Sequence, residues 1–199
     1  MFLGLRIKGD VILNLPNKLT LFRIILIPFY IFFATTSVVQ NTYFFAFIIF
    51  LLASFTDFLD GYIARNNNII TDFGKLMDPL ADKMLVISAL IIFASQGVVS
   101  SIAVIIIILR DFIVNSIRLL AASEGKVIAA DIYGKIKTVV QMVAIVMILI
   151  YQMLEEKVDI LILNSVKICA DVLVWVAVIL TVFSAINYLA KNKKFFKIK

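Results

Sequence analysis

The chain has 199 residues, 63% of them hydrophobic, and a formal net charge of +6 at pH 7. Soluble domains average about 45–50% apolar residues, so this composition excludes an ordinary globular enzyme and indicates an integral membrane protein. The basic residues are spread over the ends of apolar segments, which argues against a nucleic-acid partner. The sequence has no histidine and one cysteine, Cys169, which excludes an intrachain disulfide and a metal site built from these side chains.

Six apolar segments are long enough to cross about 30 Å of hydrocarbon as α-helices. They predict an all-α integral membrane protein in which one domain, residues 1–199, has six transmembrane helices. Residues 1–14 mix apolar side chains with Arg6 and Lys8, a pattern typical of a segment that lies on the bilayer surface. Residues 191–199 form a basic tail. The expected helices are Leu19–Thr36, Tyr43–Arg65, Lys75–Ser95, Val99–Ala121, Gly134–Leu154 and Leu163–Leu189.

The distribution of lysine and arginine predicts the orientation of these helices. The connections after Thr36 and Ser95 contain neither residue, and in the connection after Leu154 acidic residues outnumber Lys157. Most other basic residues lie at the opposite helix ends and in the tail. Loops rich in lysine and arginine stay in the cytoplasm. We therefore expect a multi-pass protein of the cell membrane with both termini on the cytoplasmic side.

Polar residues open the first expected helix. Asn17 is predicted to cap its N-terminus, and Thr20 and Arg23 follow one and two turns later on one side. The simplest interpretation of this stretch is a cap followed by an arginine that extends its head group to the membrane surface.

Four carboxylates interrupt the second and third apolar segments. Asp57 and Asp60 share one stripe of the second expected helix, and Asp78 and Asp82 share one stripe of the third. The linker at residues 66–73 is short, so the two helices are expected to form an antiparallel hairpin with facing acidic stripes. Carboxylates at close range repel each other unless a hard cation such as Mg²⁺ or Mn²⁺ binds between them. Structural ion pairs, a proton relay or an ion-transport site are the alternatives.

The acids belong to a longer motif, Asp57-x-x-Asp60-Gly61-x-x-Ala64-Arg65, then eight residues, then Gly74-x-x-x-Asp78-x-x-x-Asp82. This motif resembles the signature of the CDP-alcohol phosphatidyltransferases, integral membrane enzymes of phospholipid synthesis. The resemblance implies two bound metal ions and a CDP-diacylglycerol donor that releases CMP, and a homodimer is expected in this family. It implies that Asp82 is the general base. The implied metal ligands are Asp57, Asp60, Asp78 and Asp82. The implied donor-binding residues are Asn17, Thr20, Arg23, Gly61, Ala64, Arg65 and Gly74.

The fourth and fifth expected helices carry a basic cluster of Arg110, Arg118, Lys135 and Lys137. These cations exceed what the donor diphosphate requires, so we expect them to bind a phosphate on the acceptor. Their arrangement resembles the branch of the family that uses sn-glycerol 3-phosphate, although that branch usually has glutamate where this chain has Asp111. The alternative interpretations are an ion pair between Asp111 and either arginine, and lysines that only anchor the fifth helix at the interface.

Other activities stay open at this point. Within the family, the acceptor could instead be the one used by an inositol-phosphate, serine or cardiolipin-type enzyme, although a serine enzyme would not need the extra cations. From another class, a metal- or proton-coupled transporter would use the four carboxylates as an ion site. A structural scaffold would tolerate replacement of every acid by its amide.

Overall fold

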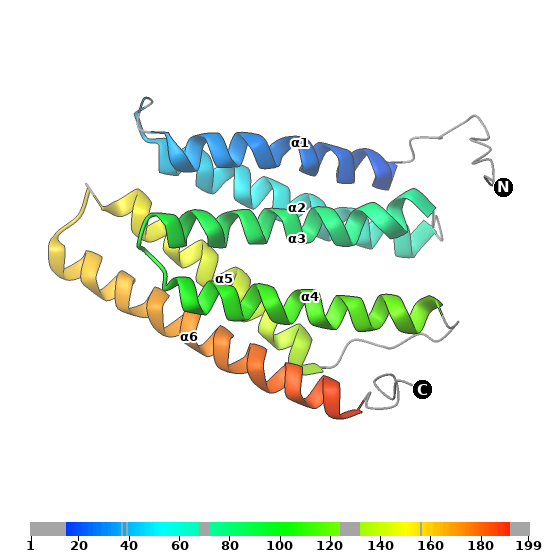
Figure 1. Ribbon diagram of the computed structural model, residues 1–199. Coiled ribbons are helices and arrows are strands. Elements are labelled where there is room, and N and C mark those ends of the chain that lie inside the picture. The colour runs from blue at the N-terminus through cyan, green and yellow to red at the C-terminus, as the bar shows by residue number, and fades with distance from the viewer. Residues whose placement is uncertain are drawn as a thin grey trace.

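The computed structural model describes residues 15–36, 38, 40–67, 72–123, 132–155 and 157–191, and within them it forms six α-helices and no strand (Figure 1). The predicted all-α fold is therefore confirmed. The helices are α1 (Leu15–Thr35), α2 (Thr42–Asn67), α3 (Asp72–Ser95), α4 (Ser101–Ser123), α5 (Ile132–Leu154) and α6 (Ile160–Lys191).

The observed helices extend a few residues beyond several of the predicted boundaries, because hydropathy marks the apolar stretch whereas helical hydrogen bonding continues into polar flanks. One prediction at these boundaries is wrong. The first helix begins at Leu15, ahead of Asn17, so Asn17 lies inside α1 and does not cap it. Pro16 occupies the first turn, where the missing N–H has no helical partner to lose.

Among the described residues, three helices are long and apolar enough to cross a membrane, at Asn17–Thr35, Ile132–Leu154 and Ile160–Lys191. Helix α4 carries three charged residues inside its length, Arg110, Asp111 and Arg118. The described parts of α2 and α3 contain shorter apolar stretches, Thr42–Asp57 and Lys83–Ser95. Length and composition therefore support three of the six predicted crossings.

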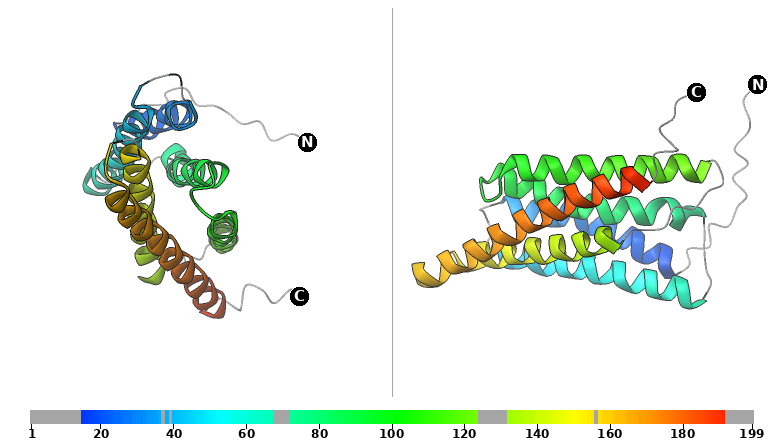
Figure 2. Two further views of the ribbon diagram at one scale, coloured as in Figure 1. Left: turned by 90° about the vertical axis from the view of Figure 1, so that its left-hand side faces the viewer. Right: turned by 90° about the horizontal axis from the view of Figure 1, so that it is seen from below.

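Seen along the bundle, α1, α2, α5 and α6 form a curved wall, and α3 and α4 lie on its concave side (Figure 2). The core contains residues of all six helices, and large side chains such as Tyr30, Phe50 and Phe93 are buried there. Small residues let the helix backbones approach closely, as is common between helices in membranes. The fully buried alanines include Ala46, Ala53, Ala81, Ala89, Ala103 and Ala121.

The helices alternate in direction, so the polar parts of α2 and α3 lie at the same end of the bundle (Figure 1). We call this the site end; α1 and α5 begin there, and α4 and α6 end there. At the opposite end, the side-chain amide of Gln152 donates to Gln96 Oε1 over 2.6 Å, and the amide of Gln96 donates to the carbonyl of Ala34 over 2.7 Å. These two bonds connect α5, the C-terminal end of α3 and α1 away from the site.

Candidate active site

An ion pair between α1 and α2 positions the first of the four acids. Nη1 of Arg23 lies 2.8 Å from Oδ1 of Asp57, and Nε of Arg23 donates to the carbonyl of Ala53 over 3.2 Å. The Arg23 side chain is 0% exposed, whereas Asp57 is 44% exposed. A surface-reaching arginine would expose its head group, so that interpretation of Arg23 is wrong. The guanidinium instead holds one oxygen of Asp57 and leaves the carboxylate accessible to a ligand.

Asn17, Thr20 and Arg23 form one buried side of α1. Their exposed fractions are 3%, 0% and 0%, although they lie at the polar end of the helix. Because α1 packs against α2 and α3, this side faces the acid-bearing helices and not the lipid. The position agrees with the donor-binding role implied by the resemblance, and that role itself stays a prediction.

Asp57 is the one member of the four acids whose side chain the structure describes. The segments carrying Asp60, Asp78 and Asp82 are helical, so the spacings of three and four residues do put each pair on one stripe. Their side chains lie outside the described residues. The same is true of Arg65 and of the surroundings of Gly61, Ala64 and Gly74. No three potential metal-binding side chains lie together among the described residues, so the metal site remains a prediction.

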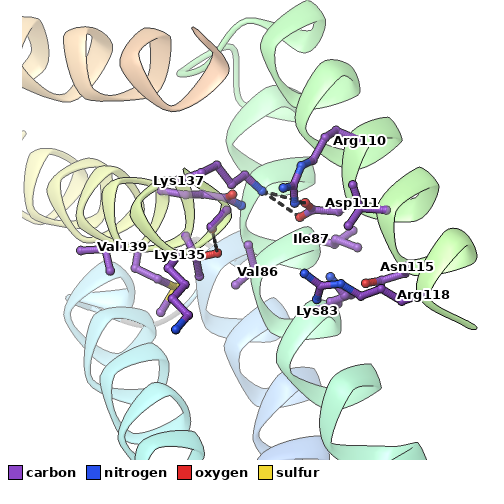
Figure 3. Close-up of a pocket in the computed structure, with 15 residues that line it drawn as sticks. Lys83, Val86, Ile87, Arg110, Asp111, Asn115, Arg118, Lys135, Lys137 and Val139 are labelled. Atoms are coloured by element: carbon purple, nitrogen blue, oxygen red, sulfur yellow. Dashed lines mark hydrogen bonds and ion pairs between the residues drawn. The ribbon is translucent and has the colours of Figure 1, made fainter. Parts of the chain in front are cut away.

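A cavity of about 440 Å³ opens between α3, α4 and α5 at the site end (Figure 3). Five of the side chains that line it are basic and one is acidic. All four predicted acceptor-binding residues are among them, so the structure brings these residues of α4 and α5 together. The polar and charged lining residues are Lys83, Arg110, Asp111, Asn115, Arg118, Lys135, Lys137, Thr138 and Gln141.

Asp111 is the counter-ion of the most buried of these cations. Nζ of Lys137 lies 2.8 and 2.9 Å from the two carboxylate oxygens of Asp111, and Nη1 of Arg110 lies 3.1 Å from one of them. Figure 3 shows Lys137 and Arg110 converging on Asp111 from α5 and α4. Lys137 is 2% exposed, and a buried ammonium requires such a partner. The alternative of an ion pair between Arg110 and Asp111 is therefore confirmed, and Lys137, which we expected to bind the acceptor phosphate, also pairs with Asp111.

The remaining cations have other environments. The guanidinium of Arg118 lies over the ring of Tyr188 on α6, 5.6 Å from its centroid, a cation–π contact that leaves the cation accessible to an anion. Lys135 is exposed at the cavity. Neither cation has an ion pair with a carboxylate among the described side chains. An anion that enters the cavity would therefore meet positive charge that the protein has not neutralised.

The structure places two further residues in this region that the sequence pattern did not indicate. Lys83 lines the cavity, and the signal in the sequence was a lysine directly after Asp82 at the start of an apolar run. Ser184, on α6, contacts the guanidinium of Arg110 at the edge of the cavity. No local signal distinguished Ser184 from the other small residues of α6.

Comparisons with known proteins match most of the chain. The family model named CDP-alcohol phosphatidyltransferase matches residues 13–183. A Bacillus subtilis protein named CDP-diacylglycerol–glycerol-3-phosphate 3-phosphatidyltransferase is 40% identical over 190 residues, covering 90% of this chain and 95% of that protein. Proteins of the same name from Haemophilus influenzae and Rickettsia felis are 37% and 34% identical, covering 90% and 92% of this chain and 94% and 97% of their own lengths. The similarity extends from α1 into α6.

Proposed function

Because this chain belongs to the CDP-alcohol phosphatidyltransferase family, we propose that it transfers the phosphatidyl group of CDP-diacylglycerol to sn-glycerol 3-phosphate and releases CMP. The names of the similar proteins support this donor and this acceptor. The observation that carries the proposal is the basic cavity at the site end, with five basic side chains and a single carboxylate.

The charge of the cavity favours an acceptor that carries its own phosphate. Asp111 neutralises part of the charge of Lys137 and Arg110, while Lys83, Arg118 and Lys135 line the same cavity and have no ion pair with a carboxylate among the described side chains. A phosphate is bound most strongly by charge-assisted hydrogen bonds, and arginine can form two of them in parallel. Glycerol 3-phosphate supplies such a group, whereas free serine does not.

We propose that Asp57, Asp60, Asp78 and Asp82 hold two Mg²⁺ or Mn²⁺ ions. Members of the family generally depend on a divalent metal ion. The donor set suits such ions, since carboxylate oxygens are hard ligands and the accessible Asp57 carboxylate lies at the site end. When bound, the ions would neutralise negative charge on the donor diphosphate.

The protein's own residues have distinct proposed roles in the transfer. The acceptor hydroxyl oxygen forms a bond to the phosphorus that bears diacylglycerol, the bond from this phosphorus to CMP breaks, and Asp82 accepts the hydroxyl proton. Arg65 binds the diphosphate, and Arg23 orients Asp57. Gly61, Ala64 and Gly74 leave room for the nucleotide beside Asn17 and Thr20. Arg110, Arg118, Lys135 and Lys137 bind the acceptor phosphate or hold the side chains that do.

We also propose that all six helices cross the cell membrane as one domain, that the site end faces the cytoplasm, and that the protein is a homodimer. The lysine and arginine distribution supports this orientation. The charges inside α4 support a crossing rather than a surface helix, because Asp111 pairs with Arg110 and Lys137 inside the bundle.

The proposal is tested by giving the purified protein CDP-diacylglycerol and Mg²⁺ with glycerol 3-phosphate, inositol phosphate, serine or phosphatidylglycerol, and by measuring CMP. We expect CMP release to require glycerol 3-phosphate and to stop with a chelator. Release with another acceptor alone would reassign the acceptor. Solute flux into proteoliposomes without CMP release would favour a transporter, and unchanged behaviour of every acid-to-amide variant would favour a scaffold.

A further inference from the structure

We propose that Ser184 of α6 and Gly134 of α5 position the guanidinium of Arg110 in the basic cavity, so that the last helix determines how well the site binds the acceptor phosphate. This inference rests on the proposed function. It assigns a role to α6 that the sequence did not indicate, and it makes Ser184 a positioning residue and not a catalytic one.

Two contacts hold the Arg110 guanidinium at different nitrogens. Nη2 donates to Oγ of Ser184 over 2.6 Å, and Nη1 donates to Oδ1 of Asp111 over 3.1 Å. A planar group held at two of its nitrogens has a fixed orientation as well as a fixed place. The third nitrogen, Nε, is buried and has no hydrogen-bond acceptor among the described residues. The orientation of the guanidinium therefore rests on the bonds at Nη1 and Nη2.

Gly134 provides the space that this arrangement needs. A Cβ atom at position 134 would lie 3.2 Å from Nη2 of Arg110 and 3.6 Å from Oγ of Ser184. The first distance is closer than an ordinary van der Waals contact. An alanine at position 134 would therefore require the guanidinium to shift by a few tenths of an ångström from its place beside Ser184.

The hydroxyl of Ser184 differs from that of Thr181, another buried hydroxyl residue on the same helix. Thr181 lies one turn earlier, is also 0% exposed, and donates to the carbonyl of Ala177 within α6 over 2.6 Å. Ser184 instead bonds to α4, to a residue 74 positions away in the sequence. The Thr181 hydroxyl therefore bonds within its own helix, whereas the Ser184 hydroxyl connects α6 to Arg110 at the cavity. This makes Thr181 a matched control.

Steady-state kinetics with each substrate varied separately tests the inference. We expect Ser184→Ala to raise the apparent KM for glycerol 3-phosphate about three- to thirtyfold, less than the loss of a direct charge-assisted contact to the phosphate, because Arg110 itself is still present. The KM for CDP-diacylglycerol and the thermal unfolding temperature should change little. Gly134→Ala should also raise the KM for glycerol 3-phosphate, although the Ser184 hydroxyl is still present. Thr181→Val should leave both constants at their wild-type values.

A double-mutant cycle decides whether Ser184 acts through Arg110. If it does, adding Ser184→Ala to Arg110→Lys should change the KM less than twofold, because the interaction is already lost. Effects that multiply in the double variant would overturn the inference, and so would an unchanged KM in Ser184→Ala.

A binding measurement separates this inference from the proposed function. Glycerol 3-phosphate, or inorganic phosphate as a simpler probe, should raise the unfolding temperature of the wild type and of Thr181→Val. Ser184→Ala should lose most of that increase. Wild-type protein that releases no CMP would contradict the proposed function, and the thermal shift would still test Ser184. An active wild type with an equally active and equally protected Ser184→Ala variant would contradict the positioning role alone.

Discussion

Asp57 Oδ1 lies 2.8 Å from Nη1 of Arg23, so an acid proposed to bind metal is also the counter-ion of a fully buried arginine on another helix. The two roles make different demands. The metal needs an accessible carboxylate, and Arg23 needs a permanent negative charge. The exposed fraction of Asp57 meets the first demand and its ion pair meets the second.

Asp57→Asn should therefore lower stability as well as activity. The substitution removes a charged partner of the buried Arg23 guanidinium, and breaking a fully buried pair costs several kcal/mol. Because Asp57 is half-exposed, we expect a smaller loss of about 1–3 kcal/mol. Thermal unfolding of the purified protein in chelator measures this loss without the metal's contribution.

Asp171→Asn is the matched control for this prediction. Asp171 is 48% exposed and pairs with Lys167 one turn away on the same helix, Nζ to Oδ1 2.6 Å. Such exposed pairs contribute less than about 1 kcal/mol. Equal destabilisation by the two substitutions would mean that the burial of Arg23 is not what makes Asp57 important for stability.

Lys135 and Lys137 should respond differently to replacement by glutamine. Lys135→Gln removes an exposed cation from the cavity, so the KM for glycerol 3-phosphate should rise about tenfold with unchanged stability. Lys137→Gln removes a buried partner of Asp111 and should lower both activity and the unfolding temperature. If each variant lost only stability, the lysines would be interface anchors and not part of the acceptor site.

Lys83→Gln tests whether Lys83, which was indicated only by its position in the cavity lining, binds the acceptor phosphate. We expect a rise in the KM for glycerol 3-phosphate of about ten- to a hundredfold, the effect of losing a charge-assisted contact to phosphate. Lys157→Gln is the control, because this exposed lysine lies at the opposite end of the bundle. An effect of similar size in both variants would point to general loss of positive charge and not to a local contact.

Asp82→Asn should abolish turnover while nucleotide binding persists. Losing a well-placed general base typically lowers the rate about 10²–10⁴-fold. Asp78→Asn should instead weaken binding of metal and nucleotide together, since Asp78 is proposed as a ligand only. For both variants, single-turnover CMP release and the affinity for CDP-diacylglycerol are measured at saturating Mg²⁺. A near-wild-type rate of CMP release by Asp82→Asn would show that Asp82 is not the general base.

Cysteine labelling tests the six crossings and their orientation. In a Cys169→Ser background, Asn67→Cys and Asn192→Cys should react with an impermeant reagent only from the cytoplasmic side, because they lie at the site end or in the basic tail. Ser100→Cys, in the exposed connection between α3 and α4, should react only from outside. Labelling of Asn67→Cys from outside would contradict a site that faces the cytoplasm.

The sequence alone determined the helices, their order and the end of the bundle at which the charged residues gather. Hydropathy is a property of a continuous stretch of sequence, and helical periodicity relates residues three and four positions apart. Both can therefore be recognised along the chain. The same local spacing placed Asp57 and Asp60 on one stripe and made Arg110, Arg118, Lys135 and Lys137 candidates for one site. The motif around the four acids identified the family, which the matched family model confirmed.

Only the tertiary structure decided which charges are paired and which are available to a ligand. Lys137 meets Asp111 from 26 residues away, and Ser184 meets Arg110 from 74 residues away. These partners lie on different helices, so their contact depends on how α4, α5 and α6 pack and not on any spacing within one helix. The burial of Arg23 has the same origin, because side chains of neighbouring helices cover it. Pairing and burial are properties of distance in space, which the order of residues along the chain does not specify.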